Sequence, residues 1–212
     1  MTAENENVKF DAAAIAPVCY GTPEMETLLN AIGESATASK AAGNNPFPAI
    51  DLIRASRLGA IRVPIDEGGG GCTVRDYFAM LMDLAAADSD VAQIVRVHYW
   101  FTEERLRAKD EAVRQRWLSR VVAGEIFANA ITEIGNKEKV GTLAMQTRLE
   151  QVDGGYVLNG TKYFCTGSLF SDWVLVAALD SEDVLTSVVV PCDREGVTLE
   201  DDWDGVGQSF TG

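Results

Sequence analysis

The spacing of apolar residues changes near residue 125, and this change constrains the fold more than any other feature of the chain. Between residues 23 and 123 the apolar side chains recur at helical spacing, whereas beyond Gly124 they alternate with small residues or form short runs. The sequence therefore predicts an α+β protein. We expect a flexible N-terminus over residues 1–20, an all-α helical bundle over residues 21–124, and an antiparallel β-sheet or barrel over residues 125–212.

Four or five helices are expected in the first part. A short helix should follow Pro46 and Pro48 and end at the left-handed cap supplied by Gly59. The apolar residues between 74 and 85 have the spacing of one buried helical face. Asp88, Ser89 and Asp90 offer N-cap groups for a longer helix whose buried stripe runs from residue 91 to 106. A last helix is expected around Trp117.

Turn signals divide the second part into short strands. Residues 147–158 read as a hairpin whose turn is supplied by Gly154 and Gly155. Residues 173–179 and 184–190 are continuous apolar runs, each about one strand long. The last residues, 201–212, are rich in turn formers. We expect either that another chain completes the sheet or that the sequence is a piece of a longer protein.

Charge and cysteine usage exclude several classes of function. The chain has 18 basic and 32 acidic residues, a net charge of −14, which disfavours binding to nucleic acid or to an anionic membrane. No apolar run is long enough for a transmembrane helix, and residues 1–10 do not resemble a secretory signal. Four cysteines far apart and a single histidine predict no metal site. We expect reduced, mostly buried cysteines in a cytoplasmic protein.

Two stretches could hold a ligand. In residues 127–133 the side chains of Asn129, Ile131 and Glu133 should share one face of a strand, opposite Ala128, Ala130 and Thr132. Small side chains on one face would let a flat ligand lie against the strand, and amide and hydroxyl groups could bond its polar atoms. The alternative is an ordinary strand followed by a glycine turn.

The second stretch, residues 158–168, places hydroxyl groups beside aromatic rings, and Gly167 allows a close approach of the backbone. The alternative is a hairpin with internally satisfied threonine and serine groups. Neither stretch alone indicates a function.

Taken together and in order, the motifs resemble those of acyl-CoA dehydrogenase-type flavoproteins. Within that superfamily the chain is most similar to the sulfur-acquisition oxidoreductase branch (the SfnB family) and to dibenzothiophene monooxygenase. The resemblance runs from about Thr22 to Gly212 and is carried by residues 58–60 with 63–64 and 68–71, by 127–133 with Gly135 and Lys137, by 159–167, and by 201–208.

The resemblance implies a helical N-terminal domain, a middle β-domain and a C-terminal helical bundle, with flavin between the last two. This sequence has the first domain and most of the second, so we expect a truncated form. In the dehydrogenases the catalytic carboxylate generally comes from the third domain. The expected activity is a flavin-dependent oxidoreductase, specifically a reduced-FMN-dependent monooxygenase acting on a small organosulfur compound. The alternatives are an FAD-dependent acyl-CoA dehydrogenase and a non-catalytic fragment that releases flavin on dialysis.

The resemblance also assigns residues and partners. It implies that flavin contacts Asn129, Ala130, Ile131, Thr132, Thr166 and Ser168, and that Trp203 either flanks the ring or plugs a turn. Gly135-Asn136-Lys137 departs from the dehydrogenase pattern and favours the monooxygenase branch, and Lys137 is either a phosphate partner or a solvated lysine. The implied partners are a flavin reductase and further copies of the chain in a dimer or tetramer.

His98 has two interpretations. As the only histidine, on the apolar stripe of a helix, it would ordinarily be a buried imidazole hydrogen-bonded to a neighbour. The resemblance instead places such a histidine near flavin as a catalytic group, where a reference pKa near 6.5 would suit proton transfer at neutral pH. The glycine run 68–71 lacks the Lys-Ser/Thr of a phosphate-binding loop, and we assign it no nucleotide role.

Overall fold

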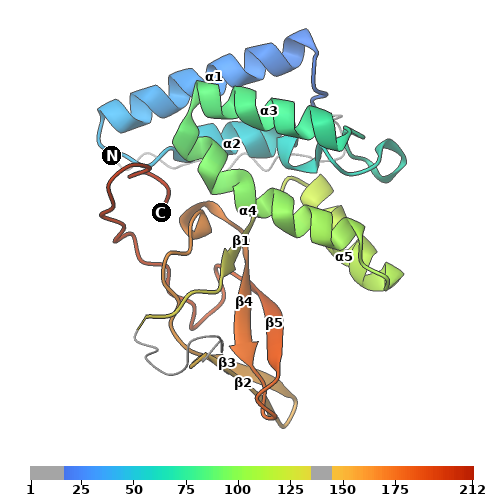
Figure 1. The fold of residues 1–212 in the computed structure, drawn as a ribbon, viewed down its shortest axis with the longest axis vertical. Coiled ribbons are helices and arrows are strands. Elements are labelled where there is room, and N and C mark those ends of the chain that lie inside the picture. The colour runs from blue at the N-terminus through green and yellow to red at the C-terminus, as the bar shows by residue number, and fades with distance from the viewer. Residues whose placement is uncertain (1–16, 135–144) are drawn as a thin grey trace, which may run out of the picture.

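The computed structural model describes residues 17–134 and 145–212. Residues 1–16, which make up most of the predicted flexible terminus, lie outside the described residues. Helices form one end of the molecule and strands the other (Figure 1). The helices are α1 (Pro23–Ala41), α2 (Phe47–Ser56), α3 (Val74–Ala87), α4 (Ser89–Leu106) and α5 (Glu111–Val122), with the short 3-10 turns η1 (Leu58–Ala60), η2 (Ile65–Glu67) and η3 (Ser168–Phe170).

The helix ends follow from their capping residues. The Asp88 carboxylate accepts hydrogen bonds from the backbone N–H groups of Asp90 and Val91, each at 3.0 Å, so the N-cap of α4 is Asp88, the first of the three predicted candidates. The predicted cap at Gly59 is wrong. Helix α2 ends two residues earlier, at Arg57, which adopts the left-handed conformation with φ 56°, and the chain continues directly into η1.

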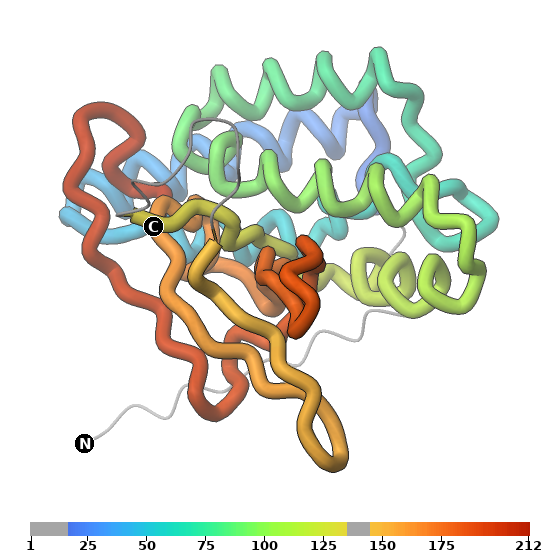
Figure 2. Tube along the Cα trace, turned by 60° about the horizontal axis from the view of Figure 1, so that its bottom comes forward, coloured from blue at the N-terminus to red at the C-terminus, as the bar shows by residue number. Residues whose placement is uncertain are grey.

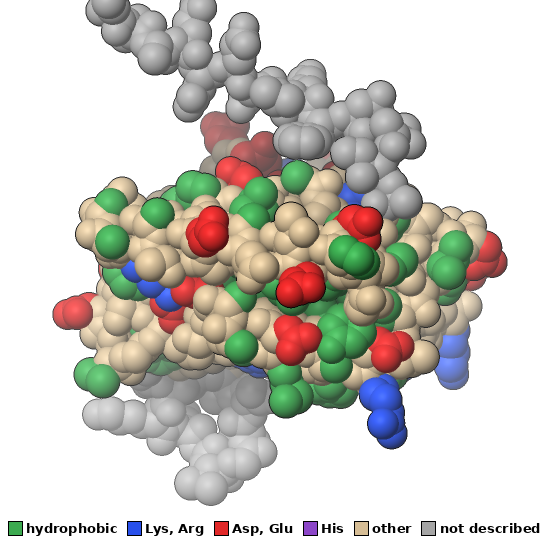
Figure 3. Space-filling view, turned by 90° about the horizontal axis from the view of Figure 1, so that it is seen from above, with side chains coloured by type: hydrophobic (Ala, Val, Ile, Leu, Met, Phe, Trp, Pro, Cys, Tyr) green, Lys and Arg blue, Asp and Glu red, His purple; other side chains and the backbone are tan. Residues whose placement is uncertain are grey.

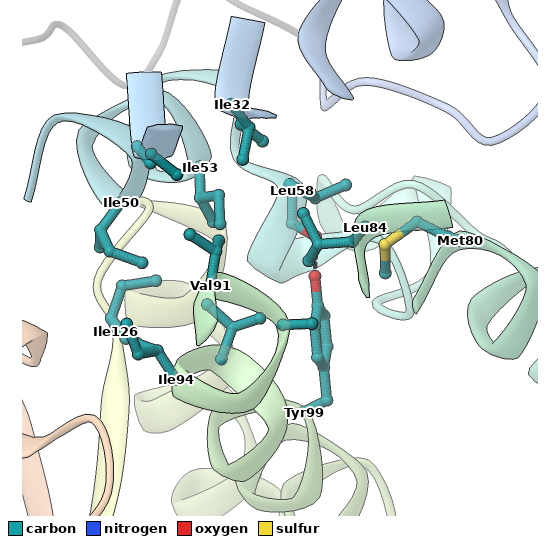
Figure 4. Packing of buried hydrophobic residues seen from close by; sticks show 14 of the residues in the cluster. Ile32, Ile50, Ile53, Leu58, Met80, Leu84, Val91, Ile94, Tyr99 and Ile126 are labelled. Atoms are coloured by element: carbon teal, nitrogen blue, oxygen red, sulfur yellow. Dashed lines mark hydrogen bonds between the residues drawn. The ribbon is translucent and has the colours of Figure 1, made fainter. Parts of the chain in front are cut away.

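The helical core is formed by side chains that α1, α2, α3 and α4 bury against one another. Ile32, Ile53, Leu84 and Tyr99 are fully buried in this cluster (Figure 4). Burial of each such aliphatic side chain stabilises the fold by about 1.5–3 kcal/mol. The predicted single buried face of α3 is only partly found, because the outer residues of that pattern are solvent-exposed: Val74, Phe78 and Met82.

The strands form a five-stranded mixed sheet around a central strand. They are β1 (Phe127–Ala130), β2 (Arg148–Val152), β3 (Gly155–Asn159), β4 (Trp173–Leu179) and β5 (Leu185–Pro191). β4 pairs with β1 in parallel from Trp173 to Val176, with β5 in antiparallel along its whole length, and with β2 in parallel at Leu179. β2 and β3 form an antiparallel hairpin.

The prediction of a purely antiparallel sheet is therefore wrong. Consecutive strands joined by tight turns pair antiparallel, as β2 and β3 do, but β1 and β4 are separated by that hairpin and by η3, so β4 can return in the direction of β1. The middle of β4, from Val174 to Ala178, is buried, as is typical of a strand paired on both edges.

The hairpin turn also differs from the prediction in detail. Gly155 pairs with Val152, so the two-residue turn is Asp153-Gly154 and not the glycine pair. Gly154 adopts φ 84°, which only glycine reaches without strain.

Two sets of contacts fix the sheet to the helices. The ring of Phe127 in β1 stacks on Phe101 in α4, with centroids 4.1 Å apart. Arg54 in α2 forms an ion pair with Asp172, whose carboxylate also accepts the Ile126 N–H at 2.7 Å. These contacts hold the start of β1 and the start of β4 against the helical layer.

The C-terminal segment runs back toward the helices after β5 (Figure 2). The Asn45 side-chain amide donates to Asp201 at 3.0 Å, and the Gly167 N–H donates to the carbonyl oxygen of Thr211 at 2.9 Å. The face seen in Figure 3 carries scattered acidic side chains with apolar side chains between them. Among the described residues, no helix is both long and apolar enough to cross a membrane.

Candidate functional site

The two ligand-binding stretches predicted from the sequence lie side by side where β1 ends. The Tyr163 N–H donates to the carbonyl oxygen of Thr132 at 2.9 Å, and the Lys162 ammonium donates to the carbonyl oxygen of Ile131 at 3.3 Å. Ala130 and Cys165 pack in the same apolar cluster, together with Val174 of β4. Residues 129–132 and 163–168 therefore lie side by side, and we call these two segments the strand-end site.

Four polar side chains at the strand-end site differ in their exposure to solvent. Asn129 and Thr166 are half-buried, Thr132 is exposed and Ser168 is buried. None of these four side chains forms a hydrogen bond with another residue in the described ranges 17–134 and 145–212. Partly buried hydroxyl and amide groups without protein partners are the donors and acceptors that a polar heterocycle requires.

The predicted strand alternation does not extend to Glu133. β1 ends at Ala130, so Ile131 and Thr132 leave the sheet and are exposed, while the Glu133 side chain turns into the protein. The sheet pairing explains the difference, since β4 pairs with β1 only as far as Ala130.

Two aromatic rings border the polar groups. Phe164 is 63% exposed and Trp203 is 40% exposed, and their rings meet edge to face with centroids 6.1 Å apart. The Trp203 indole N–H donates to the Gln208 carbonyl at 3.0 Å, which fixes the ring. Phe164 holds φ 57°, an uncommon backbone conformation for a bulky residue and one that is strained.

Beneath this surface lies a buried ion pair that the sequence analysis did not identify. The Lys162 ammonium lies 2.7 Å from Glu133 Oε1, and the two side chains are only 7% and 6% exposed. The same carboxylate accepts hydrogen bonds from the Thr147 hydroxyl at 2.5 Å, from the Thr147 N–H at 3.0 Å and from the Gln146 N–H at 2.5 Å. We call Glu133, Thr147 and Lys162 the Glu133 network.

Electrostatics keep Glu133 ionised. Burial by itself would raise the pKa of Glu133, but the hydrogen bonds from Lys162, Thr147 and Gln146 outweigh this effect and lower the pKa to about 2. Gly160 makes the network possible, because a Cβ there would lie 2.3 Å from the Thr147 hydroxyl oxygen. Glu133 and Lys162 both belong to the motifs quoted from the sequence, but only the fold shows that they pair.

His98 lies in the interior, between α4, η1 and β1. Its ring is fully buried, Nε2 lies 3.0 Å from the carbonyl oxygen of Gly59, and Nδ1 accepts the Phe127 N–H at 3.3 Å. A neutral ring protonated at Nε2 satisfies both bonds. Burial lowers the pKa of His98 to about 4, although the bond to Gly59 opposes this effect. Both ring nitrogens are thus bonded to backbone groups, as the buried-imidazole interpretation predicts, and the catalytic role implied by the resemblance stays a prediction.

Gly167 holds the second stretch against α4. Its φ is 81°, and a Cβ at this position would lie 2.7 Å from the carbonyl oxygen of Ile94. The close backbone approach predicted at Gly167 is therefore present, and the backbone that it approaches belongs to helix α4. This contact and the bond to Thr211 fix the position of Thr166 and Ser168.

Other predicted features lie elsewhere. Gly135, Asn136 and Lys137 are outside the described residues. The cysteines are less buried than expected: Cys19 is exposed, the other three are half-buried, and burial raises the pKa of Cys165. The glycine run is a tight loop, since a Cβ at Gly69 would lie 2.1 Å from the carbonyl oxygen of Val63.

One surface hollow in the described part of the chain is separate from the strand-end site. It has a volume of about 610 Å³ and lies between α1 and α3, lined in part by Tyr20, Met25 and Asp83. A second hollow, near Arg148 and Asp180, measures about 480 Å³. Neither is lined by residues 129–133 or 162–168. The unbonded polar groups and exposed rings therefore identify the strand-end site more directly than cavity size does.

Comparison with known proteins shows similarity in both halves of the chain. Residues 29–125 match the acyl-CoA dehydrogenase N-terminal domain, and residues 128–212 match the acyl-CoA dehydrogenase middle domain. A dibenzothiophene monooxygenase of Rhodococcus erythropolis is 26% identical over 175 residues, covering 80% of this chain and 42% of that protein. A probable FMNH2-dependent monooxygenase, SfnC, of Pseudomonas putida is 27% identical over 173 residues, covering 80% of this chain and 41% of that protein.

Comparison with solved structures agrees with the sequence comparison. The dibenzothiophene monooxygenase TdsC of Paenibacillus sp. A11-2, solved with FMN and indole, superposes with a TM-score of 0.74 at 25% identity, covering 89% of this chain and 48% of that one. The chain thus spans less than half the length of these relatives. The family resemblance predicted from the motifs is confirmed.

Proposed function

Because this chain belongs to the acyl-CoA dehydrogenase superfamily through both an N-terminal and a middle domain, we propose that its strand-end site binds FMN. We further propose that the chain forms part of a reduced-FMN-dependent monooxygenase acting on a small organosulfur compound. The observation that carries the proposal is the juxtaposition of residues 129–132 with residues 164–168, where unbonded polar groups lie beside exposed aromatic rings.

The residues present fit a flavin. The ring system of FMN is flat, apolar on its faces and polar at its edge, and a site for it needs aromatic or aliphatic surface next to hydrogen-bonding groups. Phe164 and Ile131 offer apolar surface, and Trp203 lies beside Phe164. Asn129, Thr132 and Thr166 offer donors and acceptors for the edge of the ring, and Ser168 and the backbone of Ala130 complete the set.

A bound reduced FMN would supply the two electrons that activate dioxygen, so that one oxygen atom would go to the substrate and the other would leave as water. The residues of this chain bind and orient the ring. The hydroxyls of Thr132 and Thr166 and the amide of Asn129 would hold its polar edge, and Phe164 and Trp203 would exclude water from it. His98 supports the site indirectly, because it fixes the first residue of β1 through the Phe127 N–H.

Two relationships of the whole protein are part of the proposal. FMN must arrive already reduced, so a flavin reductase is the expected partner, as the description of SfnC as a probable FMNH2-dependent monooxygenase suggests for that relative. The superfamily resemblance also implies assembly into a homodimer or homotetramer, which sedimentation would measure.

An NMR titration of the full chain tests flavin binding even if the affinity is low. Amide resonances would be followed while FMN is added, with FAD in a parallel titration. We expect shifts concentrated at Asn129–Thr132 and at Thr166–Ser168, and tighter binding of FMN than of FAD. Tighter binding of FAD together with binding of an acyl-CoA would favour the dehydrogenase alternative.

A variant pair gives the control. Thr166→Val removes one hydroxyl from the site and should weaken FMN about tenfold, the loss of one well-placed hydrogen bond. Thr186→Val makes the same change on β5 and should leave the affinity unchanged. Shifts confined to the hollow between α1 and α3, or equal affinities in the two variants, would refute the proposed site.

A further inference from the structure

We infer that Glu133 and Lys162 are positioning residues of the strand-end site, and that their buried ion pair sets the spacing between its two halves. The inference rests on the proposed flavin site, because it concerns the same surface. Both side chains are buried, with only 6% and 7% of their surfaces exposed, so neither is expected to touch the ligand.

The pair joins segments that no strand pairing connects. Glu133 follows the last residues of the first half, and Lys162 precedes the aromatic and hydroxyl residues of the second half. Beyond Ala130 the sheet no longer holds the first half, since the register of β1 with β4 ends there. The ion pair, the bond from Lys162 to the Ile131 carbonyl and the bond from the Tyr163 N–H to the Thr132 carbonyl hold the halves together.

Glu133 also bonds to a third segment, residues 146–147. Its carboxylate accepts the N–H groups of Gln146 and Thr147 and the Thr147 hydroxyl, just before β2 begins. One carboxylate therefore connects the chain after β1, the chain before β2 and, through Lys162, the chain after β3. A small movement of this group would move all three segments.

Burial makes the arrangement sensitive to charge. A buried ion pair contributes little net stability relative to an apolar pair, but removal of one partner leaves the other charge uncompensated. The remaining group would then draw water into the network or move toward the surface. Either response would separate Thr132 from Thr166, which the proposed site requires to face the same ligand.

The test uses the full chain with Glu133→Gln, Lys162→Met and the double variant. FMN affinity would be measured by the NMR titration, well below each variant's unfolding temperature. We expect at least a tenfold loss of affinity in each single variant and no further loss in the double variant, because both substitutions break one interaction. Lys162→Arg, which keeps the charge, should restore part of the affinity.

An exposed ion pair on the same sheet provides the matched control. Arg148 and Asp183 pair across the surface with side chains 43% and 73% exposed. The substitutions Arg148→Met and Asp183→Asn remove charges of the same kind and should leave FMN affinity unchanged.

Amide hydrogen exchange without flavin gives a second readout. Glu133→Gln should speed exchange at the Tyr163 N–H and at the Thr147 N–H, while the amides of β4 stay protected. Normal FMN affinity in both single variants, or unchanged exchange, would overturn the positioning role. If wild type does not bind FMN, the proposed function fails, and the exchange result still decides whether the pair sets the spacing of the two segments.

Discussion

The imidazole of His98 occupies the space that a side chain at Gly59 would need. Its Nε2 atom lies 3.0 Å from the Gly59 carbonyl oxygen, and a Cβ built on Gly59 would lie 2.5 Å from the same nitrogen. The other ring nitrogen accepts the N–H of Phe127. One side chain thus links η1 to the first residue of the sheet.

This relationship predicts a non-additive double-mutant cycle. Gly59→Ala should lower the free energy of unfolding by about 1–3 kcal/mol, because the new methyl group displaces a tightly packed ring. In a His98→Ala background the same change should cost close to zero, since the ring is gone. Urea unfolding of the four proteins measures the cycle, and additive losses would contradict the steric relationship.

The buried state of His98 predicts a pH dependence of stability. The folded pKa, about 4, lies below the ordinary value of 6.5, so the unfolded chain binds the proton more readily between those values. The stability that the neutral His98 ring contributes should be fully present above pH 6.5. The free energy of unfolding should fall by about 3 kcal/mol as the pH drops toward 4. Because the chain has one histidine, His98→Gln should remove this dependence, leaving only that of the carboxylates. Equal slopes in the two proteins would contradict the burial of a neutral ring.

Gly167 should tolerate alanine less well than Gly154 does. Both have positive φ, 81° and 84°, but a Cβ at Gly167 would meet the Ile94 carbonyl oxygen at 2.7 Å, whereas nothing lies within 4 Å of one at Gly154. We expect Gly154→Ala to cost about 1 kcal/mol of unfolding free energy from the backbone alone. Gly167→Ala should cost at least about 2 kcal/mol and should also weaken FMN binding. Thermal and urea unfolding compare the two, and equal losses would show that the contact with α4 relaxes freely.

We expect that the Phe164 backbone conformation lowers the stability of the fold, whereas its ring contributes to FMN binding. It holds a left-handed backbone conformation while its ring is largely exposed. Asparagine adopts this conformation at lower cost, so Phe164→Asn should raise the unfolding free energy by about 0.5–1 kcal/mol. FMN affinity should fall several-fold, because the ring is lost. The neighbouring residue Tyr163 has an ordinary, negative φ, so Tyr163→Asn should give no gain in stability. A destabilised Phe164→Asn would indicate that the edge contact with Trp203 outweighs the strain.

Local patterns were sufficient for most of the secondary structure. The period of the apolar residues located α4, three polar residues at its start included its N-cap, Asp88, and the run at 173–179 matches β4 residue for residue. These features depend on neighbours within a few residues. The predictions that failed concern longer range: the left-handed cap lies at Arg57, and half of the expected α3 face is exposed, because where a helix packs decides which of its apolar residues are buried.

The sequence named the two segments of the candidate site, but it did not show how they are held together. The motifs indicated Asn129, Thr132 and Thr166, and the fold brings their segments together. The role of His98 could not be decided from sequence, because a histidine on a buried stripe has the same pattern whether or not its ring nitrogens are bonded. The Glu133–Lys162 pair was missed because its partners are 29 residues apart and each reads alone as a solvated charge.

The sequence by itself determined which segments are helices and strands and to which family they belong, because these depend on short-range periodicity and on ordered motifs. Only the tertiary structure decided that β1 runs parallel to β4, that the His98 ring is bonded on both sides, and that Glu133 pairs with Lys162. Each of these depends on a partner distant in the chain, and the choice of partner is made by the burial and hydrogen-bond satisfaction of the whole fold.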